Sequence, residues 1–437
     1  MLKEGNLLDK RTFLRYISQN IAGMIGLSCY ILIDTLFVSI ALGASGLAAL
    51  NLAITVFSVV SAIGQLLGVG GGTDFSLRKS EGHATTACLH TALRIGGIAA
   101  LAFVVTGLCF AKPLSLLLGA DSATLELTQV YVRVTLLFSP VFILNAILQG
   151  FVRNDGVPKL AMLSMLVSSG TNILLDYVLM FPLGMGMLGA VLATGVSACL
   201  STPVLLSHFF SSRCTIRLTR AHHDLHKALR MLSYGLSALI GEMASAVSLL
   251  TFNLLLMRMS GHIGVAAYGV IANTALVATA IFTGLGQGIQ PLFSHACGAS
   301  DHAAMKKLLG YTKTSVMLLS LLIFSFVFLF AQPNAAVFNH EGSATLLELA
   351  VNGLRVYFAG YLFAGVNIAA TALLSAVCEP ARALLISMLR SCLLLIPAAL
   401  ACSHLLGVTG AWLSFVLTEA VCCVLSLIFI KQTKGIA

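Results

Sequence analysis

The stretch LAMLSMLVSSGTNILLDYVLM, residues 160–180, contains a single charged side chain, Asp176, near its end. An α-helix rises 1.5 Å per residue, so about 20 mainly apolar residues cross the roughly 30 Å hydrocarbon core of a bilayer. The stretch therefore predicts a membrane-spanning helix. Asp176 is the exception within it, because a carboxylate at membrane depth is costly and by default marks an ion or proton pathway.

Similar apolar runs fill the rest of the chain. Its 437 residues are 58% hydrophobic and 9% charged, whereas soluble domains are about 25% charged. The pattern predicts an all-α polytopic membrane protein with twelve transmembrane helices. The expected helices are residues 13–38, 45–69, 87–111, 125–148, 160–180, 187–210, 228–256, 264–289, 309–330, 349–374, 384–403 and 411–430. The first run is too long for a cleaved signal peptide, and the 11 cysteines form no C-x-x-C pair, so neither a disulfide framework nor a zinc site is expected.

The placement of basic residues predicts the orientation in the membrane. Loops that follow odd-numbered helices hold only Lys112 and Arg258 as basic residues, while the termini and the other loops are rich in Lys and Arg. Because cytoplasmic loops are enriched in basic residues, we expect a multi-pass protein of the cytoplasmic (inner) membrane with both termini in the cytoplasm. This topology accounts for the net charge of +9 without a nucleic-acid partner.

The two halves of the chain repeat one another. MGMLGAV from Met185, for example, recurs as LGVTGAW from Leu406. Transporters are often built from such repeats, so we expect two pseudo-symmetric six-helix bundles, residues 1–210 and 228–437, joined by a cytoplasmic linker at 211–227. Repeated segments have the same orientation, which predicts a pseudo-twofold axis along the membrane normal and a substrate route between the bundles.

Four polar residues of the first half are expected at one depth, in the outer half of the membrane. They are Asp34 in CYILIDTLFV, Asp176 with Asn172 one helical turn before it, and Thr194. Carboxylate, amide and hydroxyl oxygens suit a hard cation such as Na⁺, and a proton on a carboxylate could replace the ion. Alternatively, protonated or hydrogen-bonded aspartates could simply hold helices together. The sequence indicates no other metal site and no catalytic residue.

Other charged residues are also expected within spans. Glu242 and Glu419 could face a central cavity and attract cationic substrates, or could be protonated structural residues. Arg133 and Arg355 are expected to extend toward the membrane surface or to pair with acids. Arg390 is expected to reach the cytoplasmic head groups.

Two apparent motifs are not assigned a function. The glycine run 68–72 lacks the Lys-Ser/Thr of a phosphate-binding loop and ends a membrane helix where such a loop would open one. His222, His223 and His226 lie in the basic linker without an H-E-x-x-H pattern, so a solvated linker is the interpretation that we favour over a metal site.

Three segments carry a resemblance to a known family. They are DTLFVSIALGASGLAALNLA from Asp34, the stretch from Leu148 to Thr194 with its N-x-x-x-D and following G-A-x-x-A-T, and GLGQGIQPLFSHACGAS from Gly284. On these segments the chain resembles the multidrug and toxic compound extrusion (MATE) transporters over nearly its full length. It looks most like their bacterial DinF-like branch.

The resemblance implies two six-helix bundles in a V around a central cavity. It also implies export of organic cations or other amphipathic compounds, driven by entry of Na⁺ or H⁺. The coupling cation would bind at Asp34, Asn172, Asp176, Thr194 and the backbone carbonyl of Ala190. Many members of the family have a proline in the first helix where this chain has Gln19.

The sequence therefore predicts a secondary active transporter and not an enzyme. The expected protein is a monomeric antiporter for small organic compounds, which works in the bilayer by alternating access with Na⁺ or H⁺ and needs no cofactor. One alternative is a flippase for lipid-linked precursors from the same superfamily, which would line its cavity with several cationic residues. Another is an intramembrane aspartyl protease, although Asp34 and Asp176 lack the Y-D and G-x-G-D motifs that such enzymes share.

Overall fold

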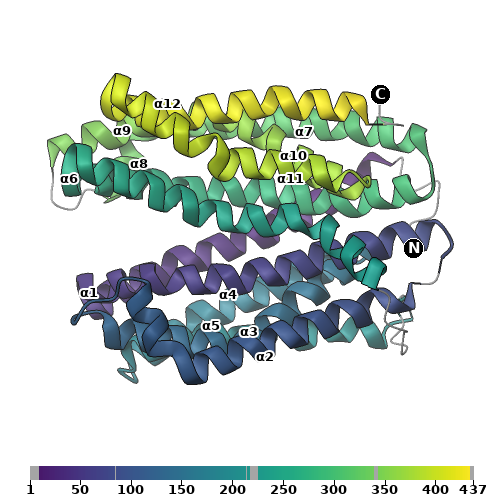
Figure 1. Ribbon diagram of the computed structural model, residues 1–437, viewed down its shortest axis with the longest axis horizontal. Helices are drawn as coiled ribbons and strands as arrows, with labels where there is room; N and C mark the ends of the chain where they lie inside the picture. Colours follow the sequence, from purple (N-terminus) through teal and green to yellow (C-terminus); the bar gives the residue numbers. More distant parts are fainter. Residues whose placement is uncertain (1–8, 84, 213, 217–224, 339–342, 434–437) are drawn as a thin grey trace. The chain divides into compact units, whose positions relative to one another are not determined.

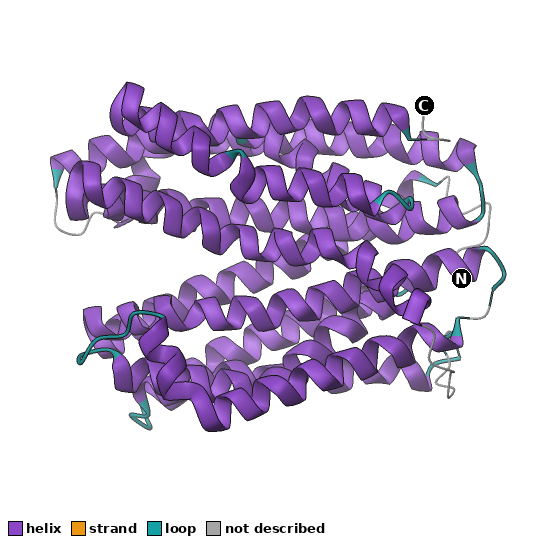
Figure 2. Cartoon of the chain, viewed as in Figure 1, coloured by secondary structure: helices purple, strands orange, loops and turns teal. Residues whose placement is uncertain are grey.

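Helices account for all the regular secondary structure in the part of the chain that the structure describes (Figure 2). The structure is a computed structural model, and it describes residues 9–83, 85–212, 214–216, 225–338 and 343–433. Most of the expected linker, including His222 and His223, lies outside the described residues. In chain order the elements are α1 (Lys10–Ser80), α2 (Thr86–Leu117), α3 (Leu125–Asn154), α4 (Pro158–Met180), α5 (Gly186–Leu206), η2 (Ser207–Phe210), α6 (Leu225–Gly298), α7 (His302–Leu329), α8 (Ala331–Phe338), α9 (Ala344–Ala359), α10 (Tyr361–Ala376), α11 (Pro380–Met388), η3 (Leu389–Leu393) and α12 (Leu395–Gln432) (Figure 1).

The helices supply the expected membrane spans. Within the described residues, 10 helical stretches are long and apolar enough to cross a membrane. The number rises to 11 if α9 and α10, which are bent by 45° relative to one another, are counted together as one span. One of these stretches, Pro380–Gln432, has 53 residues, which corresponds to about 80 Å of helix and so to two crossings. The predicted all-α fold is confirmed, and its twelve spans agree with this division.

Three glycines divide long helices into consecutive spans. Gly43 in α1 has φ 64° and ψ −155°, Gly261 in α6 has φ 60° and ψ −148°, and Gly407 in α12 has φ 63° and ψ −144°. This region of backbone conformation is open only to glycine, because any other side chain would clash with the backbone. Gly43 and Gly261 hold matching places in the two halves, as do Gly407 and Gly186, which also has a positive φ of 53°.

The internal repeat extends to side-chain hydrogen bonds. Asn145 Nδ2 in α3 donates to the carbonyl oxygen of Ala198 at 2.8 Å. Asn367 Nδ2 in α10 donates to the carbonyl oxygen of Glu419 at 2.9 Å. The two donors are separated along the chain by nearly the same number of residues as the two acceptors. The two halves therefore repeat one tertiary contact as well as short sequence motifs.

The chain divides into two compact units. The first unit contains Ser18–Glu242, and the second contains Met243–Ala437 together with the start of α1 up to Ile17. In the first unit α3 packs against α2 and α5, and α4 packs against α5. The second unit has an aromatic core in which Tyr268 stacks on Trp412 with ring centroids 6.0 Å apart.

Small residues allow close helix contacts in the first unit. A Cβ at Gly68 in α1 would overlap the carbonyl oxygen of Ala146, and one at Gly150 in α3 would overlap the backbone of Gly68. Membrane helices approach closely where small residues face one another, because lipid supplies little hydrophobic drive between them. The glycine run 68–72 thus includes a helix-packing surface, which explains its composition without a phosphate ligand.

Several local features of the second unit do not follow from the sequence pattern. Residues 331–338 form α8, and the tenth expected span is bent at Gly360, between α9 and α10. Residues 389–393 form a π-helical turn, η3. Such turns insert one residue into an α-helix and often occur at functional sites.

Candidate cation site

Close helix packing brings α1 toward α4 just before the expected site. A Cβ at Gly23 in α1 would lie 2.9 Å from Met165 Sδ of α4, and one at Gly26 would lie 2.7 Å from Leu166 Cδ2. Glycine at both positions therefore lets α1 approach α4 closely. The helix runs without interruption through Gln19, so no proline is needed to reach this arrangement.

A tight turn places α5 beside α4. The helix α4 begins with Pro158, whose fixed φ suits the first helical position, and it ends at Met180. Gly184 and Gly186 both have positive φ in the connection. Gly189 then lies against Leu179, because a Cβ there would be 3.1 Å from that residue's carbonyl carbon. The first turns of α5 are thereby held against the last turns of α4.

The four predicted polar side chains are all buried in the first unit. Asp176 is 0% exposed, Asn172 1%, Asp34 6% and Thr194 8%. Asp34 lies close enough to Asp176 for the two carboxyl groups to interact electrostatically. The structure therefore brings together residues from three separate spans, as the depth argument predicts.

The Asn172 amide connects α4 to α5 and has two possible orientations. In one, its Nδ2 donates to Thr194 Oγ1 at 3.3 Å. In the other, Nδ2 donates to Asp176 Oδ2 at 3.0 Å and Oδ1 accepts from the backbone N of Thr194 at 3.3 Å. The second orientation satisfies an ionised Asp176, because a carboxylate can only accept hydrogen bonds.

Two carboxylate oxygens at the site, Asp34 Oδ1 and Asp176 Oδ1, have no hydrogen-bond partner within the part of the chain that the structure describes. Thr194 Oγ1 donates to the carbonyl oxygen of Ala190 at 3.2 Å, which places that carbonyl at the site as well. A buried acceptor without a donor costs free energy. A small cation, or a proton on one carboxylate, would satisfy these oxygens, so the donor set fits the cation implied by the resemblance.

Glu242 also lies in the first unit but makes a different contact. Its Oε1 accepts a hydrogen bond from Ser61 Oγ at 3.0 Å. Tyr30 lies within electrostatic range of Glu242, Asp34 and Asp176. Tyr30 is therefore near both groups, and among the described residues no hydrogen bond joins Glu242 to the two aspartates.

Glu419 belongs to a separate network in the second unit. Arg390 donates to its carboxylate from Nη2 at 2.8 Å and from Nε at 2.9 and 3.0 Å. Asn367 Nδ2 donates to Glu419 Oε2 at 2.7 Å, and Ser426 Oγ donates to Asn367 Oδ1 at 2.8 Å. The prediction that Arg390 reaches the head groups is wrong, because the π-helical turn η3 places its guanidinium against a buried carboxylate.

The other two arginines expected within spans behave differently. Arg133 in α3 and Arg355 in α9 are both exposed on the surface of the described chain. The Arg355 guanidinium lies 5.3 Å from the centre of the Phe328 ring. Extension toward the membrane surface is compatible with both positions.

Sequence reasoning missed a buried network around Asp155, which follows α3. His208 Nε2 lies 2.8 Å from Asp155 Oδ2, Lys79 Nζ donates to Oδ1 at 2.6 Å, and both the backbone N and the hydroxyl of Thr215 donate to the carboxylate. Burial alone would raise the pKa of Asp155, but the hydrogen bonds from His208, Lys79 and Thr215 outweigh it and lower the pKa to about 2. Asp155 thus anchors the described start of the linker. No spacing in the sequence indicates this contact, because its partners lie 53 to 76 residues from Asp155 along the chain.

The geometry gives a helical membrane protein with two buried carboxylates, Asp34 and Asp176, from different spans. Comparison with known proteins identifies the class. The sequence model of the MatE family matches residues 21–178 and 237–400. This chain belongs to the MatE family of transporters and is a transporter, not an enzyme. The aspartyl-protease alternative is therefore rejected.

Curated relatives and solved structures agree with this assignment. The chain is 26% identical over 388 residues to the multidrug export protein MepA of Staphylococcus saprophyticus, covering 88% of this chain and 85% of that protein. It has the same identity and coverage with MepA of Staphylococcus aureus strain NCTC 8325. A MOP superfamily transporter from Pyrococcus furiosus has a similar structure, with a TM-score of 0.90, 22% identity, and coverage of 98% of this chain and 97% of that one. An outward-facing multidrug resistance MATE family transporter has a TM-score of 0.88, 23% identity and the same coverage.

Proposed function

We propose that the protein is a cation-coupled antiporter that exports organic, cationic or amphipathic compounds. The observation that carries this proposal is the pair of buried carboxylates, Asp34 and Asp176, each with one oxygen that lacks a partner. Family membership and the similarity to multidrug export proteins support export as the direction of transport. The proposed location is the cytoplasmic membrane with both termini in the cytoplasm, on the grounds of the basic residues alone.

The coupling cation, Na⁺ or H⁺, would act through these two residues together with Asn172, Thr194 and the carbonyl oxygen of Ala190. With the site empty, two close carboxylates in a buried position repel one another, and one oxygen of each has no donor among the described residues. Binding of one cation neutralises one negative charge and favours the conformation in which the oxygens converge. A ligand shifts a conformational equilibrium only through its different affinity for the two states, and this charge pair supplies such a difference.

Asn172 is the proposed link between the cation site and helix position. Its Nδ2 donates to Asp176 Oδ2, and its Oδ1 accepts from the backbone N of Thr194. The amide thus joins one of the proposed cation-binding carboxylates in α4 to the backbone of α5. A change in the charge of Asp176 on cation binding would therefore act directly on the connection between these helices.

For the substrate, we propose that Glu242 and not Glu419 attracts cationic compounds. Glu419 is already neutralised by Arg390 at 2.8 Å, whereas the described contact of the Glu242 carboxylate is a neutral hydroxyl. A carboxylate without a charged partner attracts a cation more strongly than one in an ion pair.

The proposal can be tested with purified protein reconstituted in vesicles. The vesicles carry an imposed Na⁺ gradient or an imposed H⁺ gradient. The rate at which a fluorescent organic cation is transported is measured and compared between wild type, Asp34→Asn and Asp176→Asn. Both variants should lose gradient-driven transport while remaining monodisperse. Asp121→Asn is the matched control, because the Asp121 carboxylate lies in an exposed loop between α2 and α3. Full gradient-dependent transport by either site variant would refute the assignment, and transport of a lipid-linked precursor in place of the organic cation would favour the flippase.

A further inference from the structure

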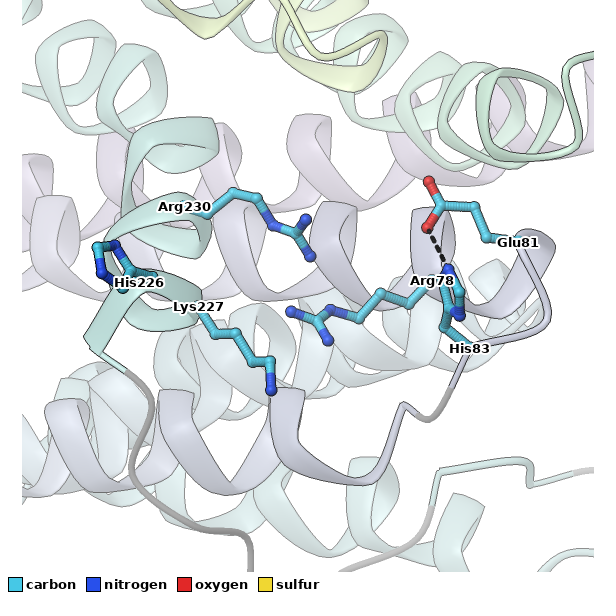
Figure 3. A pocket seen from close by; sticks show the side chains of 6 residues that line it. All are labelled: Arg78, Glu81, His83, His226, Lys227 and Arg230. Atoms are coloured by element: carbon cyan, nitrogen blue, oxygen red, sulfur yellow. Dashed lines mark ion pairs between the residues drawn. The ribbon is translucent and has the colours of Figure 1, made fainter.

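A basic cavity lies where α1 ends and α6 begins, within the first unit. It has a volume of about 280 Å³. Its lining residues are Arg78, Glu81, His83, His226, Lys227 and Arg230 (Figure 3). None of these residues belongs to the proposed cation site.

The cavity carries an excess of positive charge. Arg78 Nε lies 2.8 Å from Asp74 Oδ2, and Arg230 Nη2 lies 2.9 Å from Asp74 Oδ1. One carboxylate therefore serves two guanidinium groups, and Lys227 adds a third cation. Glu81, the one acidic residue of the lining, lies 3.8 Å from His83 Nε2. Basic side chains thus outnumber acidic ones in and beside the lining, so the cavity favours an anion.

Arg78 is held in place before any ligand binds, and Arg230 forms an ion pair with the same carboxylate. The Asp74 side chain is 4% exposed and that of Arg78 is 10% exposed, so this ion pair is fixed by the surrounding helices. Asp74 occupies only Nε of Arg78 and only Nη2 of Arg230. In Figure 3 the charged ends of Arg78, Lys227 and Arg230 point toward a common space. Such preorganisation lowers the entropic cost of binding.

The position and the chemistry of the cavity indicate its ligand. The ends of membrane spans lie at the level of the phospholipid head groups, and basic pockets there bind anionic head groups. Planar guanidinium groups match the geometry of phosphate oxygens. We propose that this cavity binds the phosphate group of an anionic phospholipid. The bound phosphate would connect the last turn of α1 to the first turns of α6.

The test compares lipid affinities of delipidated protein in a neutral detergent. Fluorescent phosphatidylglycerol and phosphatidylcholine are titrated against wild type and the double variant Lys227→Gln/Arg230→Gln. The side chain of Arg230 is 48% exposed and Lys227 is exposed, so the variant should fold. Each basic residue removed should weaken binding of the anionic lipid, and the two together should lower its affinity roughly 30-fold.

Lys306→Gln/Lys307→Gln is the matched control, because it removes two exposed charges near the start of α7, outside the cavity. Its affinity for phosphatidylglycerol should stay within about threefold of wild type, since it leaves the cavity lining intact. Equal losses in the two double variants would overturn the proposal, as would equal affinity of the wild type for the two lipids. If the double variant of the cavity is not monodisperse, Lys227→Glu alone should show the same selective loss.

A further arm identifies the source of the phosphate. Inorganic phosphate and glycerol 3-phosphate are added as competitors at millimolar concentration. A lipid site should retain most of its phosphatidylglycerol, because the acyl chains add affinity that soluble phosphates lack. Complete displacement by either soluble compound would show that the cavity binds free phosphate, and the lipid proposal would be wrong.

Discussion

The buried ion pair between Arg390 and Glu419 offers the sharpest test of how the second unit is stabilised. In Arg390→Met the guanidinium is replaced by an apolar side chain of similar length. Glu419, which is 2% exposed, would keep one side-chain donor, Asn367 at 2.7 Å. Its second oxygen would lose both bonds that Arg390 makes to it, at 2.8 and 3.0 Å.

The expected loss of stability follows from these contacts. Removing one partner of a buried ion pair costs about 3–5 kcal/mol, because it leaves an uncompensated buried charge. The side chain of Arg390 is itself 20% exposed, so some solvent reaches the pair and we expect the lower end, about 3 kcal/mol. In Arg390→Met/Glu419→Leu both charges are gone. The double variant should recover most of that loss, because apolar replacement of a whole pair is often neutral.

The assay is the apparent melting temperature in detergent, followed by size-exclusion chromatography after heating. Arg390→Met should melt on the order of 5–10 °C below wild type, and the double variant should lie close to wild type. Arg355→Met is the control, because Arg355 is an exposed arginine within a span whose described contact is the Phe328 ring. Its melting temperature should change by only about 2 °C.

The result that would refute this reasoning is a double variant no more stable than Arg390→Met. It would mean that Arg390 stabilises the unit through packing of its stem and not through the charge of Glu419. With Glu419→Leu as the second single variant, the difference between the double variant and the sum of the two single variants measures the pairwise interaction directly.

Three further predictions concern the first unit. Gly150→Ala should reduce the amount of folded protein recovered from membranes, since its Cβ would overlap the backbone of Gly68, whereas Gly97→Ala, with nothing within 4 Å, should not; equal yields would contradict the close contact. Asp155 has a pKa of about 2, below its usual 3.8, so its contribution to stability should be present above about pH 4 and lost as the pH falls toward about 2. That loss should be absent in Asp155→Asn, and an unchanged pH profile in this variant would show that other groups cause it. Thr194→Val removes one oxygen from the site, so it should need roughly tenfold more cation for the same protection against thermal unfolding. An unaltered dependence on cation concentration would exclude the hydroxyl as a ligand.

The sequence alone determined the fold class and the members of the candidate cation site. Runs of about 20 apolar residues predict spans because the bilayer has a fixed thickness, and the repeat predicts that the halves share one topology. Asp34, Asn172, Asp176 and Thr194 could be selected because a polar group inside such a run is rare and costly. Each of these inferences uses only local properties of the chain and the period of a helix.

Only the tertiary structure decided which polar groups meet. The sequence placed Arg390 near the head groups by its depth along a helix, but the π-helical turn and the packing of α10 and α12 direct its side chain to Glu419. Asp155 likewise gathers Lys79, His208 and Thr215 from distant segments. Hydrogen bonds and ion pairs act over a few ångströms and depend on side-chain direction, which depth and periodicity do not specify. The apolar pattern therefore determines where each span runs, and helix packing determines which buried charges are paired and which oxygens remain available for a cation.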